Sequence, residues 1–207
     1  MRSPASVRWA PYIAKLQEDN TRRGFIEQAQ YLALRAALPD HLKALLVVGY
    51  HCGNRLGELR KLRWGQLDLE SGEIRIEQAQ AKGKKPRTVP IYGDMTEWLA
   101  WQSKRRQPGC EFVFHWDEKR LGSHLKGWAK ACMAVGLDTL HSHVLRRSAV
   151  RMERAGIPRN VAMQISGHKT ESVYRRYDIV AEGDLKSAGE KLAAYHRQQT
   201  PKLRRVK

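Results

Sequence analysis

The sequence predicts a mainly α-helical protein with a small antiparallel β-sheet, an α+β fold. Apolar residues recur at helical spacing over most of the chain, and glycine or proline separates the segments. Two short segments instead alternate apolar and polar residues, as strands with one buried face do. The 207 residues, 42% of them apolar, suffice for one core, which predicts one domain with at most a short appendage.

The N-terminal half predicts three helices. The first lies in "NTRRGFIEQAQYLALRAALPD" and ends at a proline, and its expected buried face is Phe25, Ile26, Ala29, Leu32, Ala33 and Ala36. The second, "HLKALLVVGYHCG", is apolar on nearly every side, which indicates a buried element, with Asp40 as its cap. The third, in "NRLGELRKLRW", is short and amphipathic, and its inward residues are Leu56, Leu59 and Leu62.

The two alternating segments are "EIRIE" at 73–77 and "RTVPI" at 87–91, so they predict a hairpin whose basic loop, "QAQAKGKKP", carries Lys82. Further helices are predicted over 93–106, 121–135, 142–155, 158–165 and 181–197. The last of them aligns Leu185, Ala188 and Leu192 along one side.

The chain carries 38 lysines and arginines against 21 aspartates and glutamates, a formal net charge of +17. Such a surplus attracts polyanions. The basic residues recur through the body, at 60–63, 82–87, 104–106 and 146–154, and not only in the tail at 202–207. A folded surface that binds nucleic acid is therefore favoured over the alternative that these basic residues only line solvent-exposed helix faces.

Other classes of protein are disfavoured. Cys52, Cys110 and Cys132 are odd in number and have no CxxC spacing, which argues against a disulfide framework and a cysteine zinc site. No apolar run approaches the roughly 18 residues that span a bilayer, and the start lacks a secretory signal, so we expect a cytoplasmic protein. The sequence has no P-loop and no GxGxxG, so chemistry without ATP or a dinucleotide is expected.

Four separated segments carry residues that suit a phosphate: "GNRLGE" at Arg55, "AKGKKPR" at Lys82, "HVLR" from His143 to Arg146, and "GHKTESVYRRY" from Gly167 to Tyr177. Each alone is weak. Arg55 is typical of a helix-end arginine paired with Glu58, and a histidine pair such as His141 and His143 also suits zinc, although no cysteine or carboxylate lies at ligand spacing.

The order of these segments resembles the tyrosine recombinase family, also called the phage integrase family, over about residues 21–198. The resemblance implies the catalytic-domain fold of that family and, as catalytic residues, Arg55, Lys82, His143, Arg146, His168 and Tyr177, with Glu58 supporting Arg55. In the family the attacking tyrosine lies nine positions after the "GH" histidine, and 177 minus 168 is nine, so Tyr177 matches and Tyr174 does not. Asn54, Val144 and Ser166 depart from the residues that are usual at their positions.

These roles agree with phosphoryl-transfer chemistry. Two fixed guanidinium groups suit the charge that develops on the non-bridging oxygens, without a metal or other cofactor. His143 would accept the proton of Tyr177, His168 would hydrogen-bond the phosphate, and Lys82 would protonate the departing 5′ oxygen, although Lys84 or Lys85 could take that last role. The product would be a 3′-phosphotyrosyl bond that a free 5′ hydroxyl can reverse.

The expected function is therefore site-specific DNA recombination or integration. Type IB topoisomerase-like relaxation and a non-catalytic DNA-binding regulator are the alternatives. We expect residues 1–20 to be a linker or the remnant of a missing N-terminal DNA-binding domain, 21–198 the catalytic domain and 199–207 a basic tail. The expected partners are double-stranded DNA and other protomers, in a tetramer on DNA and a monomer in solution, with bacterial or phage origin. Expected DNA contacts are Arg60, Lys84, Lys85, Arg147, Arg175 and Arg176.

Overall fold

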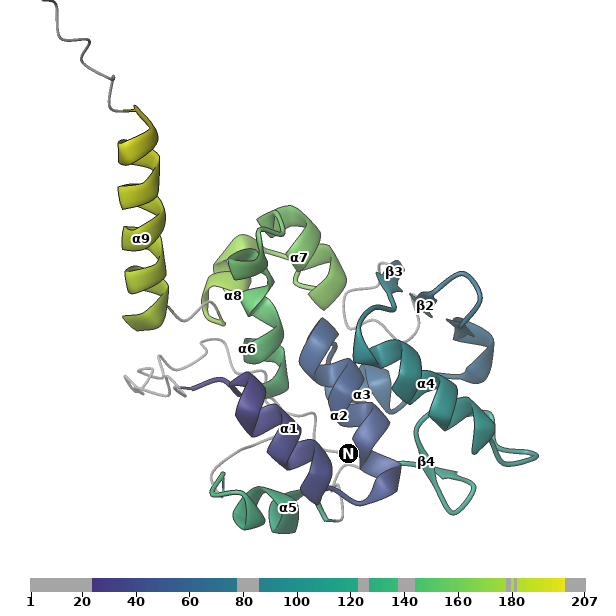
Figure 1. Cartoon of the computed structure of the whole chain (residues 1–207). Helices are drawn as coiled ribbons and strands as arrows, with labels where there is room; N and C mark the ends of the chain where they lie inside the picture. Colours follow the sequence, from purple (N-terminus) through teal and green to yellow (C-terminus); the bar gives the residue numbers. More distant parts are fainter. Residues whose placement is uncertain are drawn as a thin grey trace, which may run out of the picture.

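Helix α2 (Asp40–Cys52) runs through the centre of the fold (Figure 1). The computed structural model describes residues 24–77, 86–122, 127–137, 144–177, 180 and 182–199. Helices α1 (Gln28–Ala37), α4 (Asp94–Lys104) and α6 (Val144–Val150) pack against α2. The predicted central helix is confirmed, because α2 buries side chains on all of its sides: Leu42, Ala44, Leu45, Leu46, Val47, Val48 and Cys52. Its predicted cap was wrong, since Pro39 is the N-cap and Asp40 is the first residue of the helix.

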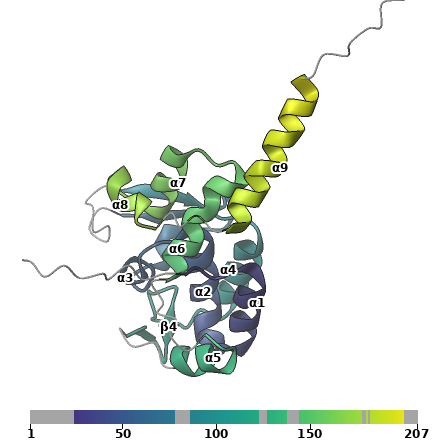
Figure 2. The same cartoon turned by 90° about the vertical axis from the view of Figure 1, so that its left-hand side faces the viewer.

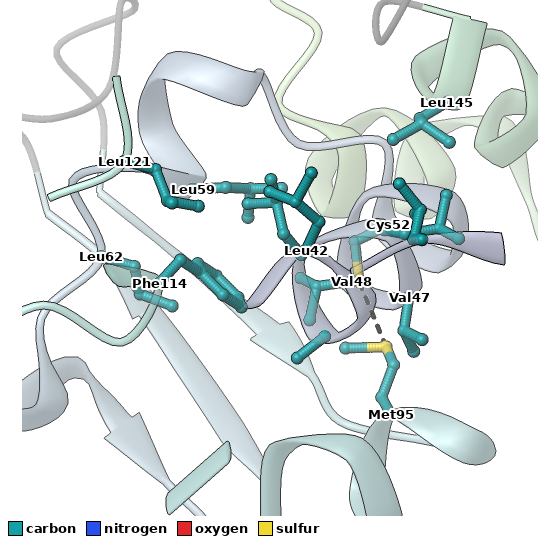
Figure 3. Close-up of a cluster of buried hydrophobic side chains, with 14 of the residues drawn as sticks. Leu42, Val47, Val48, Cys52, Leu59, Leu62, Met95, Phe114, Leu121 and Leu145 are labelled. Atoms are coloured by element: carbon teal, nitrogen blue, oxygen red, sulfur yellow. Dashed lines mark hydrogen bonds between the residues drawn. The ribbon is translucent and has the colours of Figure 1, made fainter. Parts of the chain in front are cut away.

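The main core surrounds α2 (Figure 3). Phe114, Met95 and the inward leucines of the short helix α3 (Leu56–Leu59) lie there, and the Cys52 thiol points at the Met95 sulfur, 3.6 Å away. Gly49 lets α6 come close, since a Cβ there would stand only 2.8 Å from Cδ1 of Leu145. The three cysteines are buried free thiols.

A three-stranded antiparallel sheet lies at the edge of the helical body (Figure 1). Its strands are β1 (Leu67–Asp68), β2 (Glu73–Ile76) and β3 (Arg87–Pro90), in that order, and Ile74 pairs with Val89. The predicted hairpin is thus confirmed. Strand β1 and the hairpin of β4 (His115–Trp116) and β5 (Lys119–Arg120) were not predicted, because strands of two residues are too short to show alternation of apolar and polar residues.

The C-terminal part continues from α6 through the 3-10 helix η2 (Arg151–Ala155) to α7 (Arg159–Ser166) and α8 (Glu171–Arg175) (Figure 2). A second, small core of Val150, Ala162 and Tyr174 holds these elements together. Helix α9 (Glu182–Gln199) then projects away from the body in both views. None of the described helices is both long and apolar enough to cross a membrane.

Three other expectations about the helices were wrong. The first helix begins only at Gln28. Ile26, just before it, is buried as predicted, but the rest of the predicted face is turned, since Ala29, Leu32, Ala33 and Ala36 are exposed and Tyr31, Leu34 and Leu38 are buried. Apolar residues line both stripes of this helix, and packing selected the stripe with the larger side chains. The helix predicted over 121–135 is α5 (Trp128–Ala134), which starts after Gly127 in the left-handed conformation. The short α8 was not predicted.

Asp94, the first residue of α4, joins three helices. Its Oδ2 accepts hydrogen bonds of 2.5 Å from the Tyr31 hydroxyl and from Nη1 of Arg35, both on α1. Its Oδ1 lies 2.5 Å from Nε2 of His51, in the last turn of α2. Burial and the bond to Asp94 raise the pKa of Tyr31, so the tyrosine remains a donor. One carboxylate therefore fixes where α1, α2 and α4 meet.

We predict that Asp94→Asn destabilises the fold, because an amide lacks the negative charge that Arg35 and His51 face. The free energy of unfolding, measured by urea denaturation, should fall by about 1–3 kcal/mol. Glu73→Gln is the control, since that side chain is 42% exposed and its ion pair with Arg75, within the described part of the chain, is 4.0 Å long. It should change the free energy by less than about 0.5 kcal/mol. Equal effects of the two variants would contradict the structural role of Asp94.

Candidate active site

The site begins where α2 ends. Gly53 caps α2 in the left-handed conformation, with φ of 62°, and a Cβ there would stand 2.7 Å from Cβ of Ala149 on α6. A glycine suits both the backbone angle and the close approach. The chain then turns, and Arg55 becomes the N-cap of α3. The turn places Arg55 beside α6, which carries Arg146.

Arg146 is buried, with 2% of its surface exposed. Its Nη1 donates to the carbonyl oxygens of Gly53, at 2.6 Å, and Ser166, at 2.5 Å, and its Nη2 donates to that of Gly167, at 3.4 Å. Burial and the charge of Arg55 lower the pKa of Arg146 to about 10, so the group is still a cation at neutral pH. Its acceptors lie at the ends of α2 and α7, where helix carbonyls carry partial negative charge.

Arg55 shares one of these acceptors. Its Nη1 donates to the Gly167 carbonyl at 3.2 Å and to Oε1 of Glu58 at 3.3 Å. Glu58 is buried, and its Oε2 also accepts a 2.7 Å bond from Nη2 of Arg87, on β3. Within the described part of the chain, two guanidinium groups thus bind one buried carboxylate, and the third, that of Arg146, lies close enough to feel its charge. An anion that approaches Arg55 and Arg146 meets a net positive charge in a partly dry setting.

Gly167 forms the turn that brings the "GH" segment under the arginines. It caps α7 with φ of 67°, and a Cβ there would lie 2.6 Å from Cζ of Arg87. The Arg87 guanidinium therefore lies flat against the glycine. Arg87 holds the base of the β2–β3 hairpin to α3 and to this turn.

His168 follows at once and is buried, with 6% of its surface exposed. Its Nδ1 lies 2.7 Å from Oγ of Ser166. The ring contacts two tyrosines, Tyr174 edge-on with centroids 5.1 Å apart and Tyr177 at 5.0 Å. The histidine thus directly follows the glycine whose carbonyl binds Arg55 and Arg146, and its ring lies against both tyrosines.

The two tyrosines have different environments. Tyr174 is fully buried, and its hydroxyl donates to the Val150 carbonyl at 3.1 Å. Tyr177 is half-buried, and its ring lies 5.6 Å from Cζ of Arg146. Tyr174 therefore belongs to the small core, while Tyr177 lies beside the guanidinium groups.

The other predicted site residues fall into three groups. Lys82, Lys84, Lys85 and His143 lie outside the described residues. Arg175 and Arg176 are exposed near the end of α8, where Arg175 pairs with Glu171 at 2.9 Å. Arg60 is half-buried and bonds to the Leu121 carbonyl at 2.8 Å, and Arg147 is only 8% exposed and donates to the Gly24 carbonyl. Arg147 is thus placed as a structural group.

Arg87 and Ser166 are residues of the site that the sequence did not predict. Arg87 looked like part of a basic loop, and the only available signal was its position at the first residue of a predicted strand. Ser166 stood out only as a departure from the family pattern. Away from the arginines, a cleft of about 850 Å³ lies between the start of α2, the end of α4 and the β4–β5 hairpin. It contains none of the arginines of the site, and no group of three potential metal ligands occurs among the described residues.

Comparison with known proteins gives the family of the chain. Residues 24–183 match the model of the phage integrase family, which covers most of the sequence. The chain belongs to the phage integrase family. This integrase-family chain is 26% identical over 193 residues to tyrosine recombinase XerC of Proteus mirabilis, covering 93% of this chain and 54% of that protein. It is 32% identical over 150 residues to XerC of Xanthomonas campestris, covering 66% of this chain and 44% of that one. The chain thus spans about half the length of the curated relatives it matches.

Solved structures confirm the predicted catalytic-domain fold. The XerA recombinase superposes with a TM-score of 0.68 at 18% identity, over 86% of this chain and 66% of that one. A lambda integrase dimer bound to a COC′ core site gives 0.60 at 19% identity, over 94% of this chain and 53% of that one. The architecture is thus preserved where the sequence has diverged.

We predict that Gly167→Ala lowers the free energy of unfolding of this integrase-family chain by more than the strain of an alanine in the left-handed conformation. The reason is that the new methyl group must also displace Arg87. Gly136→Ala is a matched control, since Gly136 has φ of 70° and no described atom within 4 Å of the place where a Cβ would stand. The control should lose about 1 kcal/mol in urea denaturation, and Gly167→Ala at least twice that. Equal losses would mean that Arg87 does not depend on the glycine.

Proposed function

We propose that this chain is the catalytic domain of a site-specific DNA recombinase, in which Tyr177 cleaves and rejoins DNA strands. The observation that carries the proposal is the convergence of Arg55 and Arg146 on the Gly167 carbonyl beside Tyr177. Two guanidinium groups held by backbone acceptors form a prearranged site for a phosphodiester. Residues 21–198 would make up this domain.

In each step of the proposed reaction, one phosphate ester bond forms while another breaks. The Tyr177 oxygen attacks the phosphorus, the bond from phosphorus to the 5′ oxygen breaks, and the 3′ phosphate stays on the tyrosine. His143 takes the phenolic proton, and Lys82 gives a proton to the 5′ oxygen. A 5′ hydroxyl from a second strand then reverses these steps. The phosphotyrosyl ester conserves the energy of the original bond, so the strand can be resealed.

The arginines would stabilise the charge that builds on the two non-bridging oxygens. Their side chains are fixed before DNA arrives, so little reorganisation is needed in the transition state. Glu58 holds Arg55 in place without neutralising the whole cluster, since Arg87 shares that carboxylate. His168 would complete the phosphate contacts from below.

The proposed partner is double-stranded DNA, in keeping with the net charge of +17. Arg175 and Arg176 are exposed near Tyr177, and Arg60, Lys84 and Lys85 complete the proposed contacts. We leave Arg147 out of this set, because its guanidinium group donates to the Gly24 carbonyl. Contacts to the DNA backbone alone give weak binding that falls steeply with salt.

Other protomers are the second proposed partner. Among similar structures are a lambda integrase dimer on a core site and a lambda integrase tetramer bound to a Holliday junction. In this chain α9 projects from the body and exposes Leu185, Leu192 and Tyr195 by 66%, 59% and 56%. We propose that this apolar side docks on a neighbouring protomer and not on its own body.

Trapping on a nicked suicide duplex tests the nucleophile. Because the target sequence is unknown, the substrate is a pool of random duplexes, and products are separated on a denaturing gel. We expect a covalent band from the wild type and from Tyr174→Phe, and none from Tyr177→Phe. Arg55→Ala should weaken the band by about a hundredfold. A band lost only in Tyr174→Phe would reassign the nucleophile, and wild-type protein without any band would favour a non-catalytic DNA-binding role.

Light scattering of the DNA-bound protein tests the docking of α9. We expect assemblies of more than one protomer for the full chain, and single protomers after Leu192→Glu or deletion of residues 184–207. Ser187→Glu adds the same charge on another side of α9, so it should leave the assembly intact. Docking in trans is excluded if the mass per DNA is the same for all of these proteins.

A further inference from the structure

Ser166 is the last residue of α7 and is fully buried. Its Oγ lies 2.7 Å from the carbonyl oxygen of Ala162, one turn earlier, and 3.4 Å from that of Met163. On its other side the same oxygen lies 2.7 Å from Nδ1 of His168. The hydroxyl therefore stands between a main-chain acceptor and the imidazole ring.

Only one placement of the hydrogens satisfies both short contacts of the Ser166 hydroxyl. A serine hydroxyl has one hydrogen, and a carbonyl oxygen can only accept. If the hydroxyl gave its hydrogen to His168, two oxygens would face each other at 2.7 Å with no hydrogen between Ser166 and Ala162. Both short contacts are satisfied when Ser166 donates to Ala162 and Nδ1 of His168 donates to Ser166.

We propose that Ser166 is a positioning residue that holds neutral His168 in the tautomer with its proton on Nδ1. The consequence for the phosphate rests on the proposed function. In this tautomer Nε2 has a lone pair and no hydrogen, so it repels a phosphate oxygen. His168 can donate to the phosphate only after Nε2 has gained a proton. The site would thus take up a proton as it binds DNA.

The groups around His168 fit this coupling. Arg146 on α6, Arg55 at the N-cap of α3 and Arg87 on β3 are cations near the "GH" turn, and Glu58 is the carboxylate that binds Arg55 and Arg87. Tyr174 and Tyr177 contact the ring from α8 and the segment that follows it. With so many cations, a further positive charge is unfavourable until a phosphate brings negative charge. Proton uptake and phosphate binding would then reinforce each other.

Nitrogen NMR of the DNA-free chain, labelled with ¹⁵N-histidine, tests the tautomer directly. Long-range ¹H–¹⁵N spectra distinguish a ring nitrogen that bears hydrogen from one that does not, and His168→Gln identifies the His168 signals by their loss. We expect hydrogen on Nδ1 in the neutral wild type and a shift of hydrogen toward Nε2 in Ser166→Ala. Hydrogen on Nε2 in the wild type, or no difference in Ser166→Ala, would overturn the proposal.

Ser148→Ala is the matched control. Ser148 is also buried on a helix and bonds to the carbonyl one turn earlier, Val144, at 3.3 Å, but its other bond is with the Ile26 amide. This variant should lose stability without any change in the His168 tautomer. A change in tautomer that merely follows lost stability would therefore occur in both serine variants, and would count against a specific role of Ser166.

Affinity for a DNA duplex at constant ionic strength, from about pH 6 to about pH 8, tests the coupling. Wild-type binding should weaken with rising pH by about tenfold more than that of Ser166→Ala, whose neutral imidazole can donate from Nε2. Parallel pH profiles would overturn the coupling. The NMR result needs neither DNA nor catalysis, so a failure of the proposed recombinase activity leaves it readable.

Discussion

The structure depends on the burial of the Arg146 guanidinium among backbone carbonyls. A buried cation requires acceptors, and here the ends of two helices supply them, α2 through Gly53 and α7 through Ser166. Both ends carry the negative side of a helix dipole, which makes them suitable partners for a cation. By joining these ends, Arg146 sets the distance between the segment that carries Arg55 and the segment that carries His168. The geometry of the candidate site therefore follows from the way in which one buried charge finds its hydrogen-bond acceptors.

The same cluster keeps more positive charge than its single carboxylate neutralises. Glu58 accepts from Arg55 and Arg87, while Arg146 relies on neutral carbonyls, and its lowered pKa reflects its burial and the repulsion between these cations. Such an arrangement opposes folding and favours binding of an anion. Sites that stabilise a charged transition state commonly carry this kind of local cost, since their dipoles and charges are fixed in advance. The fold offsets it with the large apolar core around α2.

Hydrogen bonds and ion pairs hold the C-terminal elements together and place Tyr174 and Tyr177 in different environments. Tyr174 enters the small core and bonds to the end of α6, which fixes α8. Arg159 pairs with Glu153 at 2.9 Å and with Glu171 at 2.8 Å, so it links η2, α7 and α8 on the outside. Because α8 is held on both of its faces, Tyr177, which follows it, lies against His168 and Arg146. Packing of one tyrosine thus orients the other.

The sequence by itself determined the fold class, the central helix, the hairpin at 73–91 and the family, because helical and strand periodicities are local and the motif spacing is unusual. It also singled out Arg55, Arg146, His168 and Tyr177, which the structure brings together. Only the tertiary structure decided which stripe of α1 is buried, because two apolar stripes compete and the partner helices choose between them. It alone showed that Arg147 bonds to the Gly24 carbonyl while Arg146 bonds to the ends of α2 and α7, and that Arg87 and Ser166 support the arginines and His168. These roles depend on contacts between segments far apart in the chain, such as the 112 residues that separate Arg55 from Gly167, and no local pattern records them.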